Sequence, residues 1–269
     1  MHDALVHNPE KSVVASGLCF AKDPAGVMSF VAEHGYHIEE GVWSRVARNA
    51  FVAAANSFDE AQHGTYRITQ SPHQLHPVFI EAAASPRLVA MMSSLLRGPV
   101  TGLQSQWFYA PAGYEGYGLH QDNHFIRAEP DAFGTLWHAV DPPTKDNGGL
   151  VILPGSHLEG IHPVDPPDRP DTPSEGDQYV FRQTCLFDRD KYIPHRLEVQ
   201  AGDVIFLHAN LIHGSLPNRT DGEFRRSFVV TYLRAGSAYR AGAGNKRVPF
   251  EVAPLPTTMP VLLESGGDA

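Results

Sequence analysis

A short run near the middle of the chain, GLHQDNHF at residues 118–125, carries three metal-competent side chains within five residues. His120 and Asp122 are two residues apart, and His124 follows two further on. In a β-strand, residues i and i+2 point to the same face, so a strand or its fraying end would project His120 and Asp122 together. An imidazole and a carboxylate are two ligands of the facial triad that binds non-haem Fe(II) and leaves coordination positions open. A metal site is therefore the first hypothesis for this run.

The same spacing of a histidine and an acid occurs at two other places in the chain. His37 is followed by Glu39, and His157 is followed by Glu159. With 15 histidines and 30 acids in the chain, the spacing alone does not choose among the three pairs.

A facial triad also needs a second histidine from a distant strand. The apolar run VIFLHANLIHGS, residues 204–215, contains His208 and His213. These two are five residues apart and would face opposite ways on a regular strand. We therefore expect at most one of them to join His120.

A pair of arginines follows in FRRSFVVTYL, residues 224–233, where Arg225 and Ser227 would share one face of a strand. A buried arginine is unfavourable unless its charge is paired, and a guanidinium binds a carboxylate through two parallel hydrogen bonds. Arg225 beside a metal would thus suit an anionic co-substrate. The alternative is that the arginine lies on the surface or forms a structural ion pair. We expect this alternative to hold for one of the two residues, Arg225 or Arg226.

The elements that must position these residues change character near residue 98. Apolar residues at helical spacing predict helices within 23–35, 42–55 and 85–98. Later segments are short, rich in β-branched and aromatic residues and separated by turn residues, which predicts strands within 100–110, 132–141, 149–155, 179–187, 202–215 and 226–234. This order predicts an α+β protein with a β-sandwich or jelly roll at its centre.

Composition narrows the class of protein and the partners. The net charge of −9 disfavours nucleic acid or an anionic membrane as the main partner. Two cysteines are too few for a secreted disulfide scaffold. The sequence has no apparent signal peptide and no run near the roughly 20 apolar residues of a membrane span. These features favour a cytoplasmic protein with free thiols. Nothing in them indicates an oligomeric state.

One segment, residues 158–178, carries five prolines and six acids without apolar periodicity. It cannot form a core strand. At this length it is either a functional loop or lid, or disordered.

Four segments occur in a characteristic order: HQD at 120–122, NGGLVILPGSH at 147–157, AGDVIFLHANLIHGSLPN at 201–218 and FRRSFVVTY at 224–232. Together they resemble the phytanoyl-CoA dioxygenase (PhyH-like) family of Fe(II)- and 2-oxoglutarate-dependent oxygenases. The resemblance runs from about Gln104 to Tyr232 and also implies O₂ as a reactant. It implies a double-stranded β-helix (jelly roll) with N-terminal helices packed on it. We expect a single domain over 1–269, with a helical part at about 1–98, a core at about 99–235 and a tail at 236–269.

Carried over residue by residue, the resemblance implies that His120, Asp122 and His213 are the iron ligands and the catalytic residues. Arg225 matches the residue that binds the distal carboxylate of 2-oxoglutarate, and Ser227 would assist it.

Other polar positions match the family less closely. Gln104 and Thr135 lie where related enzymes place contacts to 2-oxoglutarate. His124 either lines a substrate pocket or sits at a strand end, and Trp137 is either a pocket wall or part of the core. His157 belongs to the Pro-Gly-Ser-His turn and is expected to be structural.

The resemblance implies oxidation of a C–H bond, most simply hydroxylation, because Asp122 stands where related halogenases lack a carboxylate. The acidic segment and the net charge disfavour a coenzyme A thioester, so we expect a small metabolite or natural-product intermediate that is neutral or cationic. Two alternatives remain: a non-redox metal-dependent jelly-roll enzyme, such as an isomerase or hydrolase, and a jelly-roll binding module without catalysis.

Overall fold

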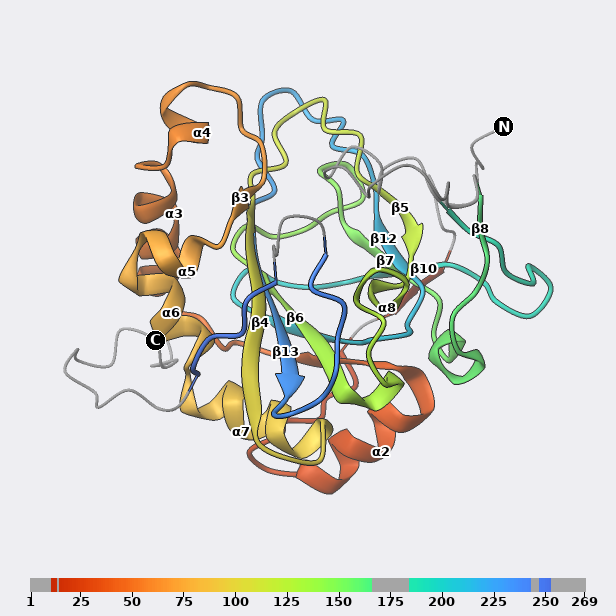
Figure 1. Cartoon of the computed structure of the whole chain (residues 1–269). Coiled ribbons are helices and arrows are strands. Elements are labelled where there is room, and N and C mark those ends of the chain that lie inside the picture. The colour runs from red at the N-terminus through yellow and green to blue at the C-terminus, as the bar shows by residue number, and fades with distance from the viewer. Residues whose placement is uncertain (1–10, 14, 166–183, 243–246, 253–269) are drawn as a thin grey trace.

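The computed structural model describes residues 11–13, 15–165, 184–242 and 247–252. Two β-sheets form the centre of the molecule (Figure 1). The larger sheet has six strands in the order β2 (Tyr36–Glu39), β11 (Val204–His208), β6 (Phe133–Ala139), β13 (Ser227–Arg234), β4 (Val100–Phe108) and β3 (Thr69–Gln70). All its neighbouring strands run antiparallel.

The second sheet has five strands in the order β1 (Lys11–Val13), β10 (His195–Leu197), β7 (Leu150–Ile152), β12 (His213–Ser215) and β5 (Tyr117–His120). From β4 to β7, and again from β10 to β13, successive strands alternate between the two sheets, as in a jelly roll. A separate hairpin-like pair joins β8 (Val164–Asp165) to β9 (Thr184–Cys185).

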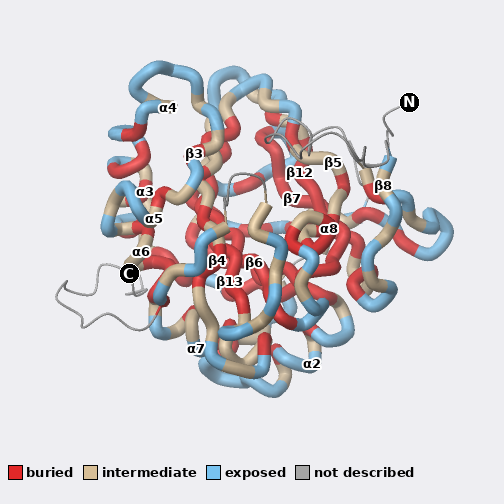
Figure 2. The backbone as a smooth tube through the Cα atoms, viewed as in Figure 1, coloured by how far each residue is buried: buried red, intermediate tan, exposed pale blue. Residues whose placement is uncertain are grey.

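The two sheets pack face to face over one apolar cluster. Ile152 and Leu197 of the smaller sheet meet Trp137, Ile205 and Val229 of the larger sheet there. Figure 2 shows the strands as the buried part of the chain, with exposed segments around them. The alternating side chains of each strand explain why one face of the larger sheet enters this cluster.

The other face of the larger sheet is covered by helices. Phe228, Val230 and Phe206 point to that side and pack with Phe51 and Phe79. The covering helices are α2 (Pro24–His34), α3 (Arg45–Ala55), α6 (Pro77–Ala83) and α7 (Pro86–Leu95), with the short α4 (Asp59–Gln62) and α5 (Pro72–Leu75) beside them. Both faces of this sheet are therefore buried, and β13 is buried along nearly its whole length.

Local signals set the helix boundaries. The Asp23 carboxylate accepts a hydrogen bond from the amide of Gly26 at 2.8 Å and caps the start of α2. Gly35 ends the same helix in the left-handed conformation with φ of 80°, which costs glycine no Cβ clash. Helix α7 ends at Leu95, before the expected end at Gly98.

Two expectations need correction, and a third can be compared with the structure only in part. The first hundred residues also supply strands, and β2 pairs directly with β11. The run 202–215 is not one strand, because it divides into β11 in one sheet and β12 in the other. Within 158–178, the described part holds a 3-10 turn (Ser156–Glu159) that runs into the segment and the start of the β8–β9 pair, whereas residues 166–178 lie outside the described residues.

In the described parts of the chain no single helix is long and apolar enough to cross a membrane. The consecutive helices α6 and α7 reach that length and apolar character only together, and they meet at a bend of 44°.

Candidate metal centre

Three side chains meet where β5, β12 and the short helix α8 (Asp122–Ile126) come together (Figure 1). His120 is the last residue of β5, and His213 is the first residue of β12. The two are register partners across the antiparallel pair, and their ring centroids lie 4.4 Å apart. Asp122 is not on the strand, as the sequence pattern suggested, but is the first residue of α8. The turn out of β5 brings its carboxylate back towards both rings.

Backbone carbonyl groups fix the orientation of both imidazoles. Nδ1 of His120 lies 2.8 Å from the carbonyl oxygen of Gly118, and Nδ1 of His213 lies 2.9 Å from that of Leu211. A carbonyl oxygen only accepts, so each Nδ1 carries the hydrogen and donates it. Each Nε2 then keeps a free lone pair, which is the form of imidazole that binds a metal.

The free nitrogens converge on the carboxylate. Oδ1 of Asp122 lies 3.6 Å from Nε2 of His120 and 3.8 Å from Nε2 of His213. These three residues are the one group of metal-competent side chains within 4.8 Å of one another among the residues that the structure describes. Two imidazole nitrogens and one carboxylate oxygen on one side of a common point match the donor set of a facial triad.

The second oxygen of Asp122 is held by a threonine. Oγ1 of Thr135 donates to Oδ2 of Asp122 at 2.8 Å and lies 3.3 Å from Oγ1 of Thr231. Burial would raise the pKa of Asp122, but His213, His120 and the Thr135 hydrogen bond together keep this pKa well below its ordinary range. Burial, and then the neighbouring His120, lowers the pKa of His213 to about 4. Near neutral pH Asp122 is therefore ionised and His213 is neutral, as metal ligands must be.

Two buried amides on either side of Asp122 fix the backbone of the site. Nε2 of Gln121 donates to the carbonyl oxygens of Gly160 and Asn210, both at 2.6 Å, and its Oε1 accepts from the amide of His162 at 2.7 Å. Gln121 thereby joins the turn into α8 to the segment that precedes His213.

Asn123 makes a second link of the same kind. Its Nδ2 donates to Oδ1 of Asn210 at 2.9 Å and to the carbonyl oxygen of Ala128 at 3.1 Å. Its backbone amide donates to the carbonyl oxygen of Ala209 at 3.0 Å. Sequence reasoning missed this network. The only local signal is that amide residues alternate with the ligands in His-Gln-Asp-Asn.

A second feature is the buried Arg225, which directly precedes β13 and is 1% exposed. Nη1 donates to Oγ of Ser227 at 3.1 Å, and the guanidinium carbon lies 5.6 Å from the ring centre of Trp137. Nε is buried without a hydrogen-bond partner. Gly148 approaches so closely that a Cβ there would lie 3.4 Å from this Nε. Among the described residues Arg225 has no carboxylate in ion-pair contact, so its charge is available to an anion.

The neighbouring Arg226 is different. Its Nε and Nη2 donate to the two carboxylate oxygens of Asp141 at 2.7 and 2.9 Å. The expectation that one arginine of the pair is a structural ion pair is therefore confirmed for Arg226.

The sequence also pointed to Gln104, Trp137 and His124 as possible co-substrate or substrate contacts. Gln104 on β4 faces Thr231, which in turn pairs with Thr135 in the next strand. Trp137 lies in the cluster between the sheets and against Arg225, so it is both core and wall of that arginine's site. His124 is buried within α8, packs on Phe125 and does not join the three metal-competent side chains.

The two other histidine–acid pairs are used elsewhere. Nε2 of His37 lies 2.8 Å from the carboxylate of Glu39 inside the β2 edge, where Arg87 also pairs with Glu39. Nε2 of His157 lies 3.2 Å from the carbonyl oxygen of Ala32, and Glu159 pairs with Lys191. Of the three pairs, His120–Asp122 is thus the one that forms, with a second histidine, a group of close metal-ligand atoms among the described residues.

A jelly roll that holds two histidines at strand ends and an aspartate at the start of the following helix is typical of metal-binding jelly-roll enzymes. Comparison with known proteins gives the family. The model of the phytanoyl-CoA dioxygenase (PhyH) family matches residues 39–227, and the chain belongs to this family. The family resemblance stated from the four motifs is confirmed.

Curated relatives agree. Phytanoyl-CoA dioxygenase 1 of Oryza sativa subsp. japonica is 31% identical over 153 residues, which are 56% of this chain and 52% of that protein. The peroxisomal phytanoyl-CoA dioxygenase of Rattus norvegicus is 28% identical over 239 residues, or 88% of this chain and 61% of that protein. The matched part of the chain thus spans between about half and three fifths of the length of these relatives.

Solved structures confirm the fold. The α-ketoglutarate-dependent carbocyclase SnoK from nogalamycin biosynthesis aligns with a TM-score of 0.67 at 21% identity, over 87% of this chain and 91% of that chain. EvdO2 from Micromonospora carbonacea var. aurantiaca, solved with 2-oxoglutarate, aligns with a TM-score of 0.62 at 18% identity, over 82% and 95%. The predicted mainly β jelly-roll class is therefore confirmed.

Proposed function

We propose that this protein is an Fe(II)- and 2-oxoglutarate-dependent dioxygenase that oxidises, most simply by hydroxylation, a C–H bond of a small molecule. The observation that carries the proposal is the convergence of two free Nε2 atoms and one ionised carboxylate oxygen at His120, His213 and Asp122. Membership of the phytanoyl-CoA dioxygenase family supports the same chemistry.

In this proposal His120, Asp122 and His213 would hold Fe(II), and 2-oxoglutarate and O₂ would be its co-substrates. The bound metal, with its co-substrate, supplies the oxidising chemistry. The protein holds the ligand atoms in place: carbonyl groups fix both rings, and Thr135 fixes Asp122. The donor set fits iron better than a structural zinc site, which would be closed by a fourth protein ligand.

Arg225 is the proposed partner of the distal carboxylate of 2-oxoglutarate. Its guanidinium is buried, it has an unpaired Nε, and Ser227 sits 3.1 Å from its Nη1. The ring of Trp137 supports the cation from the side. Gln104 and Ser227 would add polar contacts to the co-substrate. The Thr135 hydroxyl already donates its hydrogen to Asp122, so it would contact the co-substrate only as a hydrogen-bond acceptor.

The substrate class is proposed as a small metabolite or natural-product intermediate. The structural neighbour SnoN is described in complex with nogalamycin RO, and SnoK is described as a carbocyclase of the same biosynthesis. Both align over most of their length, so the proposed substrate class rests on likeness of fold. His124 and Trp137 stay candidates for its lining. We also propose that the helices and both sheets form one domain, because shared apolar clusters join them.

A non-redox metal enzyme or a binding module explains less of the structure. Neither has a use for a fully buried, unneutralised Arg225 near the metal centre. A binding module would in addition have no need of two histidines oriented with free Nε2 atoms.

The test is anaerobic addition of Fe(II) and then 2-oxoglutarate to the metal-free protein. Formation of a weak visible charge-transfer band, with one iron and one 2-oxoglutarate bound per chain, is the expected result. Arg225→Ala should keep the iron and lose about 2–4 kcal/mol of 2-oxoglutarate binding, which is roughly 30- to 1,000-fold in affinity. Arg226→Ala is the matched control, because its charge is already neutralised by Asp141. Equal 2-oxoglutarate affinity in Arg225→Ala and native protein would contradict the assignment.

A further inference from the structure

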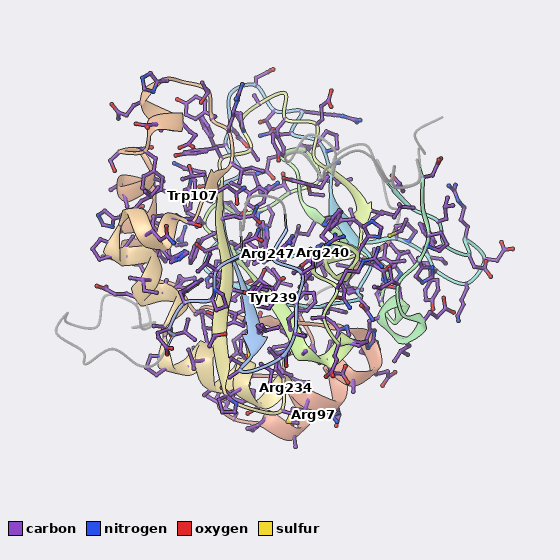
Figure 3. All side chains as sticks on the ribbon, in the orientation of Figure 1. Arg97, Trp107, Arg234, Tyr239, Arg240 and Arg247 are labelled. Carbon is purple, nitrogen blue, oxygen red and sulfur yellow. The ribbon has the colours of Figure 1, made fainter. Side chains whose placement is uncertain are left out.

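The C-terminal segment after β13 is attached to the metal centre's own helix. The backbone amide of Arg240 donates to the carbonyl oxygen of Ile126, the last residue of α8, at 2.7 Å. Further on, Phe250 and Gly102 exchange two backbone hydrogen bonds of 2.8 and 2.9 Å, and these fix the segment to β4. Figure 3 shows Arg240 and Arg247 close together over the centre of the molecule, away from Arg97 and Arg234 at its lower edge.

The charge of Arg240 already has protein partners. Its Nε donates to the carbonyl oxygen of Phe125 at 2.9 Å, and its Nη2 donates to that of His124 at 3.4 Å. These are carbonyl groups of α8, where positive charge is favourable. Arg240 is therefore a structural residue that holds the segment on α8.

Arg247 has fewer partners. The one hydrogen bond of its guanidinium in the described structure runs from Nη1 to the carbonyl oxygen of Arg240, at 3.1 Å. Its Nε is buried without a partner, and no described carboxylate is in ion-pair contact with it. Burial and the nearby positive charge of Arg240 lower the pKa of Arg247, while the carboxylate of Asp122 opposes this change. The guanidinium is thus partly buried, poorly neutralised and within electrostatic reach of the metal centre.

The two poorly neutralised arginines lie in different surroundings. Burial lowers the pKa of both arginines. Tyr114, Tyr117 and Asp141 oppose this change at Arg225, whereas Asp122 opposes it at Arg247. One arginine is sufficient for the distal carboxylate of 2-oxoglutarate. The second is held, through Arg240, on the side of α8, the helix whose first residue is Asp122.

We propose that Arg247 binds a carboxylate of the primary substrate and so holds that substrate beside the metal centre. The proposal rests on the proposed dioxygenase function and specifies its substrate class. A guanidinium with a free Nε presents the parallel donors that a carboxylate accepts. A monoanion fits better than a phosphate dianion, because a single arginine must balance it near the negative charge of Asp122. The acidic segment at 158–178 had favoured a neutral or cationic substrate, and this proposal departs from that expectation.

A carboxylate at this position has two sources, the primary substrate and 2-oxoglutarate itself. The first part of the test separates them. Fe(II)-loaded Arg247→Gln is titrated with 2-oxoglutarate without oxygen, by calorimetry and by the charge-transfer band. An affinity within about twofold of the native protein is expected. A loss of about tenfold or more would overturn the proposal and assign Arg247 to the co-substrate.

The second part measures charge selectivity in the protein loaded with Fe(II) and 2-oxoglutarate. The probes are acid–amide pairs of equal shape: benzoate and benzamide, hexanoate and hexanamide, octanoate and octanamide. Calorimetry measures binding whether or not the visible band changes. The native protein should prefer the acid in at least one pair by about tenfold or more. Arg247→Gln should remove that preference, while Arg97→Gln, an exposed arginine elsewhere, should keep it.

The outcomes are distinct. Absence of any acid preference in the native protein, or survival of the preference in Arg247→Gln, would overturn the proposal. Failure of the native protein to bind iron and 2-oxoglutarate together would instead contradict the dioxygenase function, since that step precedes addition of the probes.

Discussion

Two clusters of the same composition lie in this molecule: the metal centre of His120, Asp122 and His213, and a second cluster of His157, His208 and Asp131. The histidine rings are almost equally close in both, with centroids 4.4 Å apart in the metal centre and 4.9 Å apart in the second cluster. Ring proximity therefore does not distinguish a metal site from an ordinary polar contact here.

The difference lies in the nitrogen lone pairs. In the second cluster, Nε2 of His208 bonds to Oδ1 of Asp131 at 3.1 Å, and its Nδ1 accepts from the amide of Asn210 at 3.1 Å. Nε2 of His157 is directed at the carbonyl oxygen of Ala32. No pair of free nitrogens converges, whereas in the metal centre both Nε2 atoms face one carboxylate oxygen. Hydrogen bonds to the far side of each ring decide what the near side can bind.

The largest expected effect is loss of metal from one cluster alone. His213→Ala should weaken Fe(II) binding by more than about 100-fold. Mutation of a residue that only hydrogen-bonds to a metal ligand already lowers metal affinity by about 10- to 100-fold, and loss of the ligand itself should cost more. His208→Ala should bind one iron per chain with native affinity. Iron stoichiometry and affinity under anaerobic conditions measure both. Metal loss in His208→Ala with retention in His213→Ala would exchange the roles assigned to the two clusters.

The second prediction concerns acid stability. Burial, and then the neighbouring His208, lowers the pKa of His157 to about 4, against about 6.5 in the unfolded chain. The unfolded state therefore binds the proton more readily, and stability that is present above pH 6.5 is lost as the pH falls towards 4. The contribution is up to about 3 kcal/mol.

Denaturant unfolding of the metal-free protein at pH 7 and pH 4 tests this contribution. His157→Gln should lose less unfolding free energy over that range than the native protein. An identical loss in both would show that His157 does not carry the acid sensitivity of the second cluster.

A smaller effect is expected from the amides that support the metal centre. Asn123→Ala removes the bonds to Asn210 and Ala128 and weakens the link between α8 and the segment before His213, where the Gln121 bond remains. We expect about tenfold weaker iron binding. Asn147→Ala is the matched control, because this buried asparagine also makes two side-chain bonds, to Thr144 and Pro142, but at another turn. Equal iron affinity in both variants would remove Asn123 from the support of the ligands.

The smallest effect should come from the second cluster's carboxylate. Asp131→Asn removes a charge whose side chain is 66% exposed, so its pairing with His208 is worth less than about 1 kcal/mol. Asp122→Asn, the corresponding change in the metal centre, should abolish tight iron binding. A thermal shift and an iron titration on both variants make the comparison. Similar results for the two aspartates would mean that the clusters differ less than their geometry indicates.

Local patterns in the sequence predicted much of the structure. Helical periodicity located α2, α3 and α7, and the β-branched and aromatic residues at 226–234 predicted the strand β13. Four motifs in order identified the family and pointed to His120, Asp122 and His213 before any contact was known. Such features depend on residues near one another in the chain, so composition and spacing report them directly.

Other features came only from the tertiary structure. His208 and His213 are separated because they enter different sheets, not because of odd spacing on one strand. Asp122 reaches the histidines by leaving β5, and Gln121 and Asn123 hold that turn through contacts with residues 160, 209 and 210. The neighbours of each arginine likewise decide its state. Asp141 neutralises the charge of Arg226, whereas Arg225 and Arg247 each keep a buried Nε without a hydrogen-bond partner.

The physical reason is the same in each case. The amino-acid sequence determined which side chains are able to bind a metal or an anion, and the periodicity of the elements that carry them. Whether a nitrogen keeps its lone pair, or a guanidinium its charge, depends on hydrogen bonds and burial supplied by residues far away in the chain. Only the pairing of β5 with β12, and the packing of the C-terminal segment on α8, decided those partners.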